Sequence, residues 1–412
     1  MVVPLKKFTR DRSANVGIIF AFAAVPLIGG AGAAVDYSRA TTASAVLQAT
    51  LDSAVLAGMS LPAREKKLGK SPTAVAKATF HANLADKAVS SSFNFHDGVL
   101  SGTATMPVKT YVIQMFGMSN LVASAKSAAS AEPLRGPVCF MAMHPSRKHT
   151  LELKDSVSVF APDCHIYGNS DDVDDVVDPH TPNNFLTGKT VQAIGYGHHY
   201  IQNVKPPLQY APEYVPDPLA TMSIPNDPSC TVTNKKIANQ TVTLSPGTYC
   251  QGLQISNNSN VTLLPGTYYI RGGAFLVSKS TVVGDGVTIV SWGTTTPLDW
   301  SSSTVRLSAP KSGPLAGIVV TGERNASTST LTDSTVDLHG VIYLPKSAFT
   351  WTNSGTPDIT AKWTSWIVDG ISWLGNGTIK INFDPANSTV PYPTALNNVV
   401  PRVGPGSVRL IK

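Results

Sequence analysis

Apolar residues run almost without interruption from Ala14 to Val35, near the start of the chain. The stretch reads ANVGIIFAFAAVPLIGGAGAAV, and Asn15 is its only strongly polar member. At about 1.5 Å of rise per residue, a helix of this length crosses the roughly 30 Å hydrocarbon core of a bilayer. We therefore predict a transmembrane helix over residues 14–35.

The apolar pattern changes its period after Val35. Asp36-Tyr37-Ser38-Arg39 leads into a stretch with no Pro or Gly before Gly58. Its apolar residues recur at three- and four-residue spacings, which places them on one helix face; they are Ala43, Val46, Leu47, Leu51, Ala54 and Val55. We predict one long helix of the pilin type, lipid-embedded in its first half and amphipathic in its second. An ordinary amphipathic helix that covers a head domain gives the same pattern.

The residues before the apolar stretch are mostly basic. Lys6, Lys7, Arg10 and Arg12 stand against a single acid, Asp11. Anionic lipid and the membrane potential hold such a tail in the cytoplasm. Residues 1–13 are therefore predicted to be the cytoplasmic tail of a single-pass membrane protein. The bulk of the chain would then be periplasmic or extracellular.

Two other interpretations of the apolar stretch stay open. A cleaved signal peptide has a basic start, an apolar run and an A-x-A-like site, here Ala31-Gly32-Ala33. The run is longer than the roughly 7 to 15 apolar residues of such a signal. A buried core helix is the second interpretation, and the flanking charges and all-round apolarity count against it.

Residues 36–138 are predicted to complete the long helix and to form a small pilin-like α+β head. Ser71-Pro72 matches a helix N-cap followed by a first-turn proline. Strand-like runs flank Asp97-Gly98, a dipeptide typical of tight hairpin turns. Phe116-Gly117 breaks the next run, and VASAKSAASA closes the unit.

Residues 139–229 are rich in proline, so a loop-rich β region is predicted. Five acids gather in its middle, namely Asp171, Asp172, Asp174, Asp175 and Asp178. They lack the Gly and terminal Glu of a calcium loop, which favours a solvated acidic loop. His198-His199, with His165 and His180 upstream, are possible metal ligands, yet adjacent residues of a strand point to opposite faces. No metal site is expected there.

An internal repeat marks residues 230–390. The stretch from Thr243 to Tyr249 (TLSPGTY) recurs 19 residues later, from Thr262 to Tyr268 (TLLPGTY). A looser Ser-Thr-Val echo starts at Ser280, Ser303 and Ser334, and apolar runs lie between the echoes. Short β runs at such intervals, separated by turns, predict a β-solenoid resembling a right-handed parallel β-helix. A jelly roll or sandwich is the alternative, and residues 391–412 are predicted to be a C-terminal tail.

Four cysteines, Cys139, Cys164, Cys230 and Cys250, follow the apolar stretch. An even number in an oxidising compartment suggests disulfides, and none forms a C-x-x-C pair of the kind that binds zinc. Three pairings are possible. We prefer Cys139–Cys164 and Cys230–Cys250 because both close short loops, each worth roughly 3 kcal/mol in the chain-entropy model.

Composition favours an extracytoplasmic β protein. Charged residues make up 14% of the chain, against about 25% in an average soluble domain, while Gly and Pro number 32 and 30. The net charge of +6 is spread thinly, with clusters only in the N-terminal tail and in residues 64–70 (REKKLGK), so no nucleic-acid partner is expected.

Catalytic patterns are missing from the repeat region. Its acids are scattered, and Asp337 and His339 alone share a strand face. No paired carboxylates or nucleophile triad stand out, so no enzyme and no cofactor is expected. Exposed tryptophans would be able to stack on sugars, although core packing explains most of them equally well; these are Trp292, Trp300, Trp351, Trp363 and Trp373.

Residues along the long helix also match a family pattern. They are Asp11, Gly17, Phe20, Ala21, Pro26-Leu27, Gly32, Val35-Asp36-Tyr37-Ser38-Arg39, Leu47-Gln48, Leu51-Asp52, Ala54 and Leu56-Ala57. In these residues the segment from Arg10 to Ala57 resembles the N-terminal domain of TadG-like proteins of the tight-adherence (Flp) pilus machinery. The PGTY-rich part from Cys230 to Asp384 resembles the C-terminal half of a subset of these proteins.

The resemblance implies an inner-membrane-anchored, pilin-like protein. Its anchoring and helix-packing residues would be Gly17, Phe20, Pro26, Asp36, Tyr37, Arg39, Leu47, Gln48, Leu51 and Asp52. There are two departures. Gly17 is followed by Ile-Ile-Phe instead of Glu and Tyr, so prepilin cleavage is not expected. Asp155-Ser156-Val157 has Val in place of the first ligand Ser of a von Willebrand-type metal site.

The sequence thus predicts an α+β and all-β chain that acts as a non-catalytic, pilin-like or assembly component of a tight-adherence pilus or related secretion machinery. The expected partners are the inner membrane, other pilus-assembly or pilin-like proteins and copies of the chain itself. A secreted or surface β-helix that binds or cleaves polysaccharide is the alternative, with a periplasmic sensor third. Cleavage of the N-terminal segment and glycan binding stay open.

Overall fold

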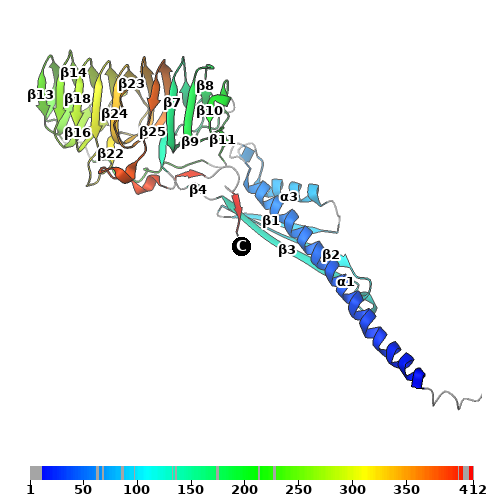
Figure 1. Cartoon of the computed structure of the whole chain (residues 1–412). Helices are drawn as coiled ribbons and strands as arrows, with labels where there is room; N and C mark the ends of the chain where they lie inside the picture. Colours follow the sequence, from blue (N-terminus) through cyan, green and yellow to red (C-terminus); the bar gives the residue numbers. More distant parts are fainter. Residues whose placement is uncertain are drawn as a thin grey trace, which may run out of the picture. The chain divides into compact units, whose positions relative to one another are not determined.

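The computed structural model describes two compact units. The first comprises residues 1–61, 69–131 and 408–412, and the second residues 62–68 and 132–407 (Figure 1). The described residues are 12–61, 65–66, 69–84, 88–96, 98–131, 133–134, 137–172, 176–211, 214–225, 229–397, 399–401 and 408–411. Most of the predicted basic tail, and three of the seven residues of the basic cluster at 64–70, lie outside them.

Two α-helices belong to the first unit. Helix α1 (Arg12–Met59) is continuous, as the change of apolar period after Val35 predicted. Helix α3 (Pro72–Asn83) begins at the predicted cap, where the Ser71 hydroxyl accepts a hydrogen bond from the Ala74 N–H at 3.1 Å. The cap satisfies one of the N–H groups that a helix start leaves without a partner.

An antiparallel sheet completes this unit, in the order β1-β2-β3-β28. Its strands are β1 (Ser90–His96), β2 (Val99–Lys109), β3 (Asn120–Ala131) and β28 (Val408–Leu410), and a short 3₁₀ helix, η2 (Ile113–Phe116), joins β2 to β3. The predicted hairpin is present, with His96 opposite Val99 and Gly98 at φ 74°. The structure differs from the prediction at the C-terminus, because β28 pairs with β3 where a separate tail was expected.

The core of the first unit lies between α1, α3 and the sheet. Most of its buried side chains are small or aliphatic, which brings the helix backbone close to the strands; they include Leu47, Leu51, Ala54, Phe80, Ala104, Ala123, Ala125 and Ala129. A Cβ added to Gly58 would lie 2.5 Å from the Pro72 carbonyl oxygen, so α1 and α3 pack closely there.

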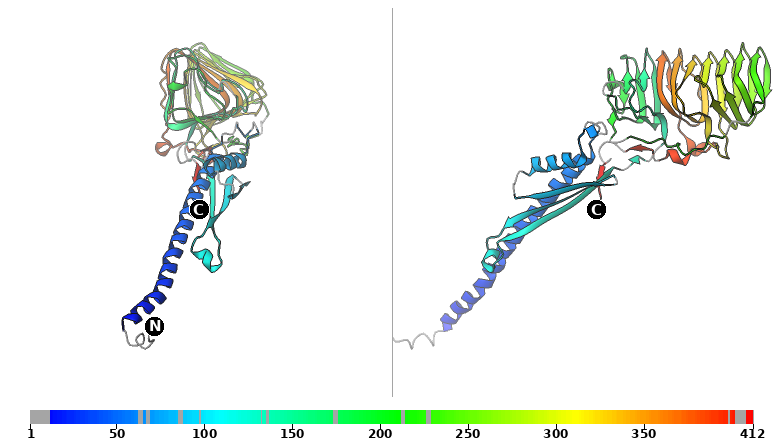
Figure 2. Two further views of the ribbon diagram at one scale, coloured as in Figure 1. Left: turned by 90° about the vertical axis from the view of Figure 1, so that its right-hand side faces the viewer. Right: turned by 180° about the vertical axis from the view of Figure 1, so that it is seen from behind.

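The second unit is a large β-rich body with one closed, barrel-like parallel sheet. Its strands are β5 (Val138–Ala142), β6 (Leu151–Leu153), β7 (Ser158–Gly168), β8 (Val177–Pro179), β9 (Phe185–Ala193), β10 (Val204–Lys205), β11 (Gln209–Tyr210), β12 (Val232–Ala238), β13 (Thr241–Leu244), β14 (Gly247–Ser256), β15 (Asn260–Leu263), β16 (Gly266–Arg271), β17 (Phe275–Ser278), β18 (Thr281–Gly284), β19 (Val287–Trp292), β20 (Leu298–Ser301), β21 (Thr304–Ser308), β22 (Ile318–Gly322), β23 (Ser327–Thr332), β24 (Thr335–Asn353), β25 (Thr364–Gly375) and β26 (Thr378–Lys380). The strands trace a closed outline when the unit is seen end-on (Figure 2, left).

Smaller elements accompany the large sheet. Strands β4 (Pro133–Leu134) and β27 (Val400–Pro401) form an antiparallel pair. Three short 3₁₀ helices complete the described elements: η3 (Ile201–Asn203), η4 (Pro385–Asn387) and η5 (Thr394–Leu396).

The sequence repeats become columns of paired residues. Thr243 pairs with Thr262 in parallel strands β13 and β15, so the 19-residue offset is the spacing of neighbouring strands. The Ser-Thr-Val echo behaves likewise, because Thr281 pairs with Thr304 and Thr304 with Thr335. The preceding serines form a ladder in which each hydroxyl accepts from the previous serine's N–H, at 3.1 to 3.3 Å.

The order of the strands along the chain differs from their order in the sheet. Strand β25 pairs on one side with β24 and on the other with β5 and β6, so residues 137–211 extend the sheet from the C-terminal end of the repeats. A loop-rich region apart from the repeats was predicted here. Strand β5 instead has all its residues buried, which is typical of a parallel strand covered on both faces.

Aromatic side chains fill the interior of the second unit. Trp300, Trp351, Trp363 and Trp373 are fully buried, which corrects the interpretation of these side chains as exposed sugar-stacking groups; Trp292 alone of that set is half-buried. Trp366 lies at the junction of the two parts of the sheet, paired with Ile342 and Phe140.

Both predicted disulfides are present. Cys139 is bonded to Cys164 and Cys230 to Cys250, with Cα–Cα distances of 5.5 and 5.7 Å. Each bridge links neighbouring strands or strand ends of the parallel sheet, so it constrains the stacking of adjacent turns.

Candidate functional site: the two halves of helix α1

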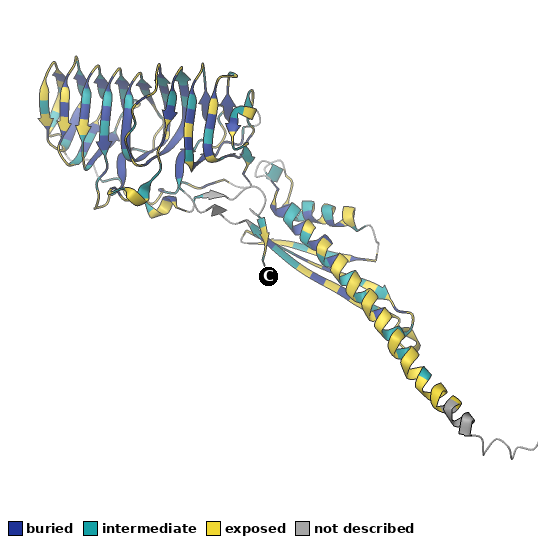
Figure 3. Cartoon of the chain, in the orientation of Figure 1, coloured by how far each residue is buried: buried dark blue, intermediate teal, exposed yellow. Residues whose placement is uncertain are grey.

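The first half of α1 exposes its apolar side chains. Ile19, Phe20, Phe22, Val25 and Leu27 are 68 to 79% exposed (Figure 3). The helix is long and apolar enough to cross a membrane, and almost none of its most apolar window is buried within the chain. An apolar surface of this size without cover in a soluble chain marks a contact with lipid or protein.

The second half of α1 buries one stripe of side chains. The buried or half-buried positions recur at helical spacing and face the sheet; they are Asp36, Ala40, Ala43, Leu47, Thr50, Leu51, Ala54, Val55, Gly58 and Met59. The change from an exposed to a packed helix falls at Asp36, one residue after the end of the predicted span. The apolar period of the sequence changes at the same place.

Asp36 joins α1 to the loop after β2 by hydrogen bonds. Its carboxylate accepts hydrogen bonds from the backbone N–H groups of Tyr111, Val112 and Ile113, at 2.8 to 3.0 Å, and the residue is 1% exposed. These N–H groups lie at the start of η2, where a helix presents donors without an internal partner. Bonds from several N–H groups to a carboxylate are among the stronger protein hydrogen bonds.

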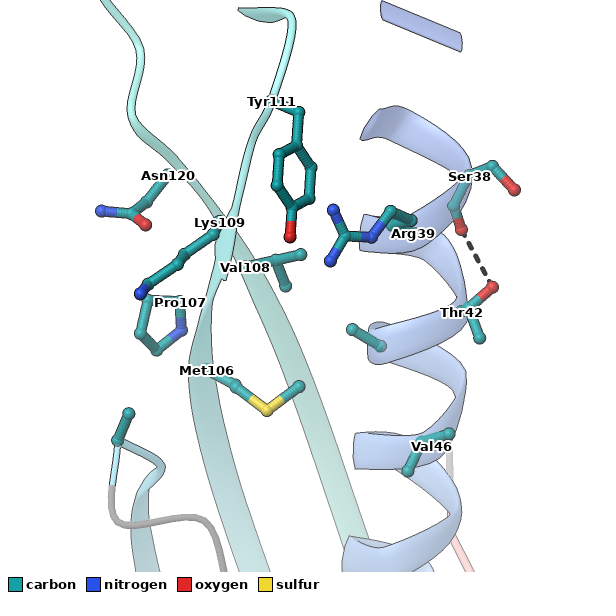
Figure 4. A pocket seen from close by; sticks show the side chains of 12 residues that line it. Ser38, Arg39, Thr42, Val46, Met106, Pro107, Val108, Lys109, Tyr111 and Asn120 are labelled. Carbon is teal, nitrogen blue, oxygen red and sulfur yellow. Dashed lines mark hydrogen bonds between the residues drawn. The ribbon is translucent and has the colours of Figure 1, made fainter. Parts of the chain in front are cut away.

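Arg39 lies one helical turn further and holds the same loop. Its guanidinium carbon is 4.5 Å from the centre of the Tyr111 ring, a cation–π distance. Beside this pair is an open groove of about 870 Å³ between α1 and the ends of β2 and β3 (Figure 4). Its lining combines the basic groups of Arg39 and Lys109 with the apolar side chains of Val46 and Met106.

The second motif, Leu47-Gln48 with Leu51-Asp52, packs against the sheet. Leu47 and Leu51 are fully buried. The Gln48 amide donates to the Asp52 carboxylate at 2.8 Å and to the Lys126 carbonyl of β3 at 2.9 Å. The Leu-Gln and Leu-Asp pairs thus supply the apolar contact and the polar bridge between α1 and β3.

The remaining residues of the predicted set have no such role within the described chain. Gly17, Phe20 and Pro26 lie in the exposed half, and Tyr37 is 68% exposed. Gly32, in contrast, allows α1 to pack closely against the loop after β2, because a Cβ there would collide with the Val112 side chain. Sequence reasoning missed Tyr111, Val112 and Ile113 as the partners of Asp36, since they lie about 75 residues away and have no motif.

Other candidate residues of the sequence have structural partners. The Asp337 carboxylate accepts from the Thr360 and Ala361 N–H groups, and His339 Nε2 contacts the Ser388 hydroxyl at 2.8 Å. The predicted solvated acidic loop is wrong for Asp171 and Asp178, which are buried. Asp174 and Asp175 lie outside the described residues.

The histidines also depart from the expectation. His198 and His199 lie outside the strands, so the argument from alternating faces fails. His199 approaches His180 and Asp178, and His198 contacts His199. His165 lies in β7, where its Nδ1 contacts the Thr190 hydroxyl at 2.8 Å.

Comparison with known proteins agrees with the interpretation of α1. Residues 15–64 match the family model described as "Putative Flp pilus-assembly TadE/G-like". The matched segment covers nearly all of α1, including its exposed half and the Asp36 and Leu47 motifs, which confirms the predicted resemblance. No curated protein and no solved structure matches the chain.

Proposed function

We propose that this protein is a membrane-anchored, pilin-like or assembly component of a tight-adherence (Flp) pilus or a related secretion machinery, and that it has no catalytic activity. The observation that carries the proposal is the switch along α1 at Asp36, from exposed apolar side chains to a packed stripe, inside the segment that matches the family. A pilin-like helix needs these two halves, one for lipid or neighbouring helices and one for its own head.

The basic tail gives the orientation. Lys6, Lys7 and Arg10 precede the exposed half of α1, so in this proposal the N-terminus lies in the cytoplasm, and the second unit and the part of the first unit after Val35 lie beyond the inner membrane. The two disulfides agree with an oxidising compartment. Partners would be other pilin-like or assembly proteins, and further copies of this chain, that contact α1 upstream of Asp36 once it leaves the lipid.

The second unit would be a β-solenoid that presents an extended surface to such partners. Each parallel strand pairs with the strand one turn further along, at offsets of 19 to 31 residues, so every turn covers the apolar face of the next. Its buried acids have structural partners: Asp337 accepts a hydrogen bond from the Thr360 N–H, and Asp369 accepts one from Arg147.

Membrane fractionation tests the anchor directly. We expect the native protein to resist carbonate extraction and to have the intact mass of the full chain. A soluble species that begins near Ala34 would overturn the anchor, and would favour the secreted polysaccharide-binding alternative.

A pair of variants tests the location of the span. Phe22→Lys places a charge in the exposed apolar half and should lower membrane retention, because a central Lys costs roughly 2.5 to 3.5 kcal/mol on insertion scales. Ala49→Lys places the same charge on an exposed position of the packed half and should leave retention unchanged. Equal retention of both variants would contradict the proposed span.

A further inference from the structure

Three imidazoles converge on one buried carboxylate in the second unit. Asp178 lies in β8 and has no exposed surface. Its Oδ2 is 3.1 Å from His149 Nδ1 and 3.3 Å from His180 Nδ1, and its Oδ1 is 2.9 Å from His199 Nδ1. Four of the chain's nine histidines gather here, because His198 Nδ1 lies 2.9 Å from His199 Nδ1.

The contacts of His199 place two partners on one ring nitrogen. A ring nitrogen of a neutral imidazole carries either a proton or a lone pair, so it donates or accepts at one time. His199 Nδ1 has to donate to the Asp178 carboxylate, yet the same atom faces His198 Nδ1 at hydrogen-bond distance. One Nδ1–H would then be shared between two acceptors, whereas a cation bound by His199 Nδ1 and the Asp178 carboxylate needs no proton on that nitrogen.

The charges around Asp178 also favour a cation. Glu152 pairs with Asp178 in adjacent strands β6 and β8, so two buried carboxylates lie side by side. Glu152 is held by the Lys154 ammonium at 2.8 Å and the Ser372 hydroxyl at 2.7 Å. The ion-pair partners of Asp178 are imidazoles, which are cationic only when protonated. Burial of a carboxylate costs several kcal/mol unless positive charge compensates it.

The fold brings the four side chains together from different turns of the sheet. Asp178 and His180 lie two residues apart at the end of β8, while His149 precedes β6 and His199 follows the bridge between Val177 and Gly197. His149 and His199 have φ values of 52° and 47°, a left-handed backbone that few non-glycine residues adopt. Both rings contact the Asp178 carboxylate from these two positions.

We propose that Asp178, His180 and His199 bind one divalent transition-metal cation of the zinc type. Ligand atoms of the three residues lie within 4.8 Å of one another. Imidazole nitrogens with one carboxylate are typical zinc ligands, whereas calcium and magnesium take oxygen ligands. Two ligands about 2.0 to 2.1 Å from a tetrahedral zinc lie roughly 3.3 Å apart, close to the spacings around Asp178.

The cation would tie together the turns that carry β8 and residues 197–200. This part of the sheet lies near its end, beside the short strands β10 and β11 (Figure 1). The site is independent of the proposed anchor and pilus role, since it uses residues of the second unit alone.

Zinc titration of the full-length protein, purified in detergent and stripped with chelator, tests the proposal. We expect isothermal titration calorimetry with zinc chloride to give one site per chain, and cobalt(II) in its place to give the visible absorption of a tetrahedral centre. Thermal unfolding should shift upward with zinc, because a ligand that binds only the folded state stabilises it.

His180→Gln is the main variant, because its side chain is 48% exposed and the change should leave the fold intact. We expect it to weaken zinc binding by at least about 100-fold, since even outer partners of metal ligands contribute about 10- to 100-fold. Asp178→Asn should abolish binding. The matched control is His81→Gln, an exposed histidine of α3, with unchanged binding.

Two results would overturn the proposal. One is the absence of stoichiometric zinc or cobalt binding by the unaltered protein. The other is zinc binding of equal affinity in the unaltered protein and His180→Gln, which would assign the metal to adventitious sites and leave the imidazoles as a hydrogen-bonded cluster.

Discussion

The two units of this protein are stabilised in different ways. The first rests on one long helix over a small antiparallel sheet, with a core rich in alanine and leucine. The second rests on a closed parallel sheet with fully buried tryptophans and two disulfides. The first leaves half of its main helix uncovered, whereas the second covers its apolar faces by its own strands.

The two units thus have different kinds of apolar surface, one covered by strands of the same chain and one left exposed. In the second unit, apolar strands pair with apolar strands of the same chain, as in the column Ile342, Trp366 and Phe140. In the first unit, Phe22 and Leu27 have no partner within the described chain. Among the described residues, the long uncovered apolar stretch therefore lies in the first unit.

Two probes follow the units separately. All six tryptophans lie between residues 292 and 373, so their fluorescence reports the second unit. The helices α1 and α3 lie in the first unit, so helical circular dichroism reports chiefly that unit. Each prediction below should change the signal of one unit and leave the signal of the other unit unchanged.

Trp366→Ala should have the largest effect. Trp366 is 1% exposed and packs against Phe140, Phe349 and Trp351. Its truncation should lower the free energy of unfolding of the second unit by about 3 to 5 kcal/mol, measured by denaturant titration with fluorescence detection. Amide exchange in β5 should rise as well, because Trp366 holds β5 to β25. Half-buried Trp292→Ala should have a much smaller effect, and equal losses would contradict the assigned junction.

Acid should weaken the second unit through His165. Burial, and next the nearby Lys189 ammonium, lowers the pKa of His165 to about 4 from 6.5. The unfolded chain binds this proton first as pH falls, so stability is full above pH 6.5 and declines until about pH 4. The decline is about 3 kcal/mol for this group. Fluorescence-detected unfolding at several pH values should show a smaller decline for His165→Gln, and an unchanged pH profile would contradict the assignment.

Asp36→Asn should have the smallest effect of the three, confined to the first unit. The amide keeps the shape of the carboxylate but loses the charge and one acceptor oxygen, which weakens the bonds from Tyr111, Val112 and Ile113. Hydrogen bonds to charged groups contribute about 1.5 to 3 kcal/mol, so a loss of about 2 kcal/mol is expected. Circular dichroism during denaturation in detergent measures it. Tyr37→Phe, at an exposed position, is the control, and a similar loss in both variants would contradict the role of Asp36.

Local patterns predicted much of the first unit. The apolar period placed the boundary at Asp36, Ser71-Pro72 placed the start of α3, and Asp97-Gly98 placed the hairpin. Each of these signals lies within a few residues of the feature that it predicts. The partners of Asp36 in the loop after β2 were not predicted, because backbone N–H groups carry no sequence pattern.

The sequence by itself determined the anchor-like helix and the 19-residue register of Thr243 with Thr262, and it favoured the two disulfide pairs among three possible pairings. These depend on periodicity, repetition and short loops, which are local properties. Only the tertiary structure decided that β5 joins β25, that β28 closes the small sheet, and that Asp178 meets His180 and His199. Parallel pairing between distant segments depends on which strand edge is open in the folded chain, and the residues themselves do not record that choice.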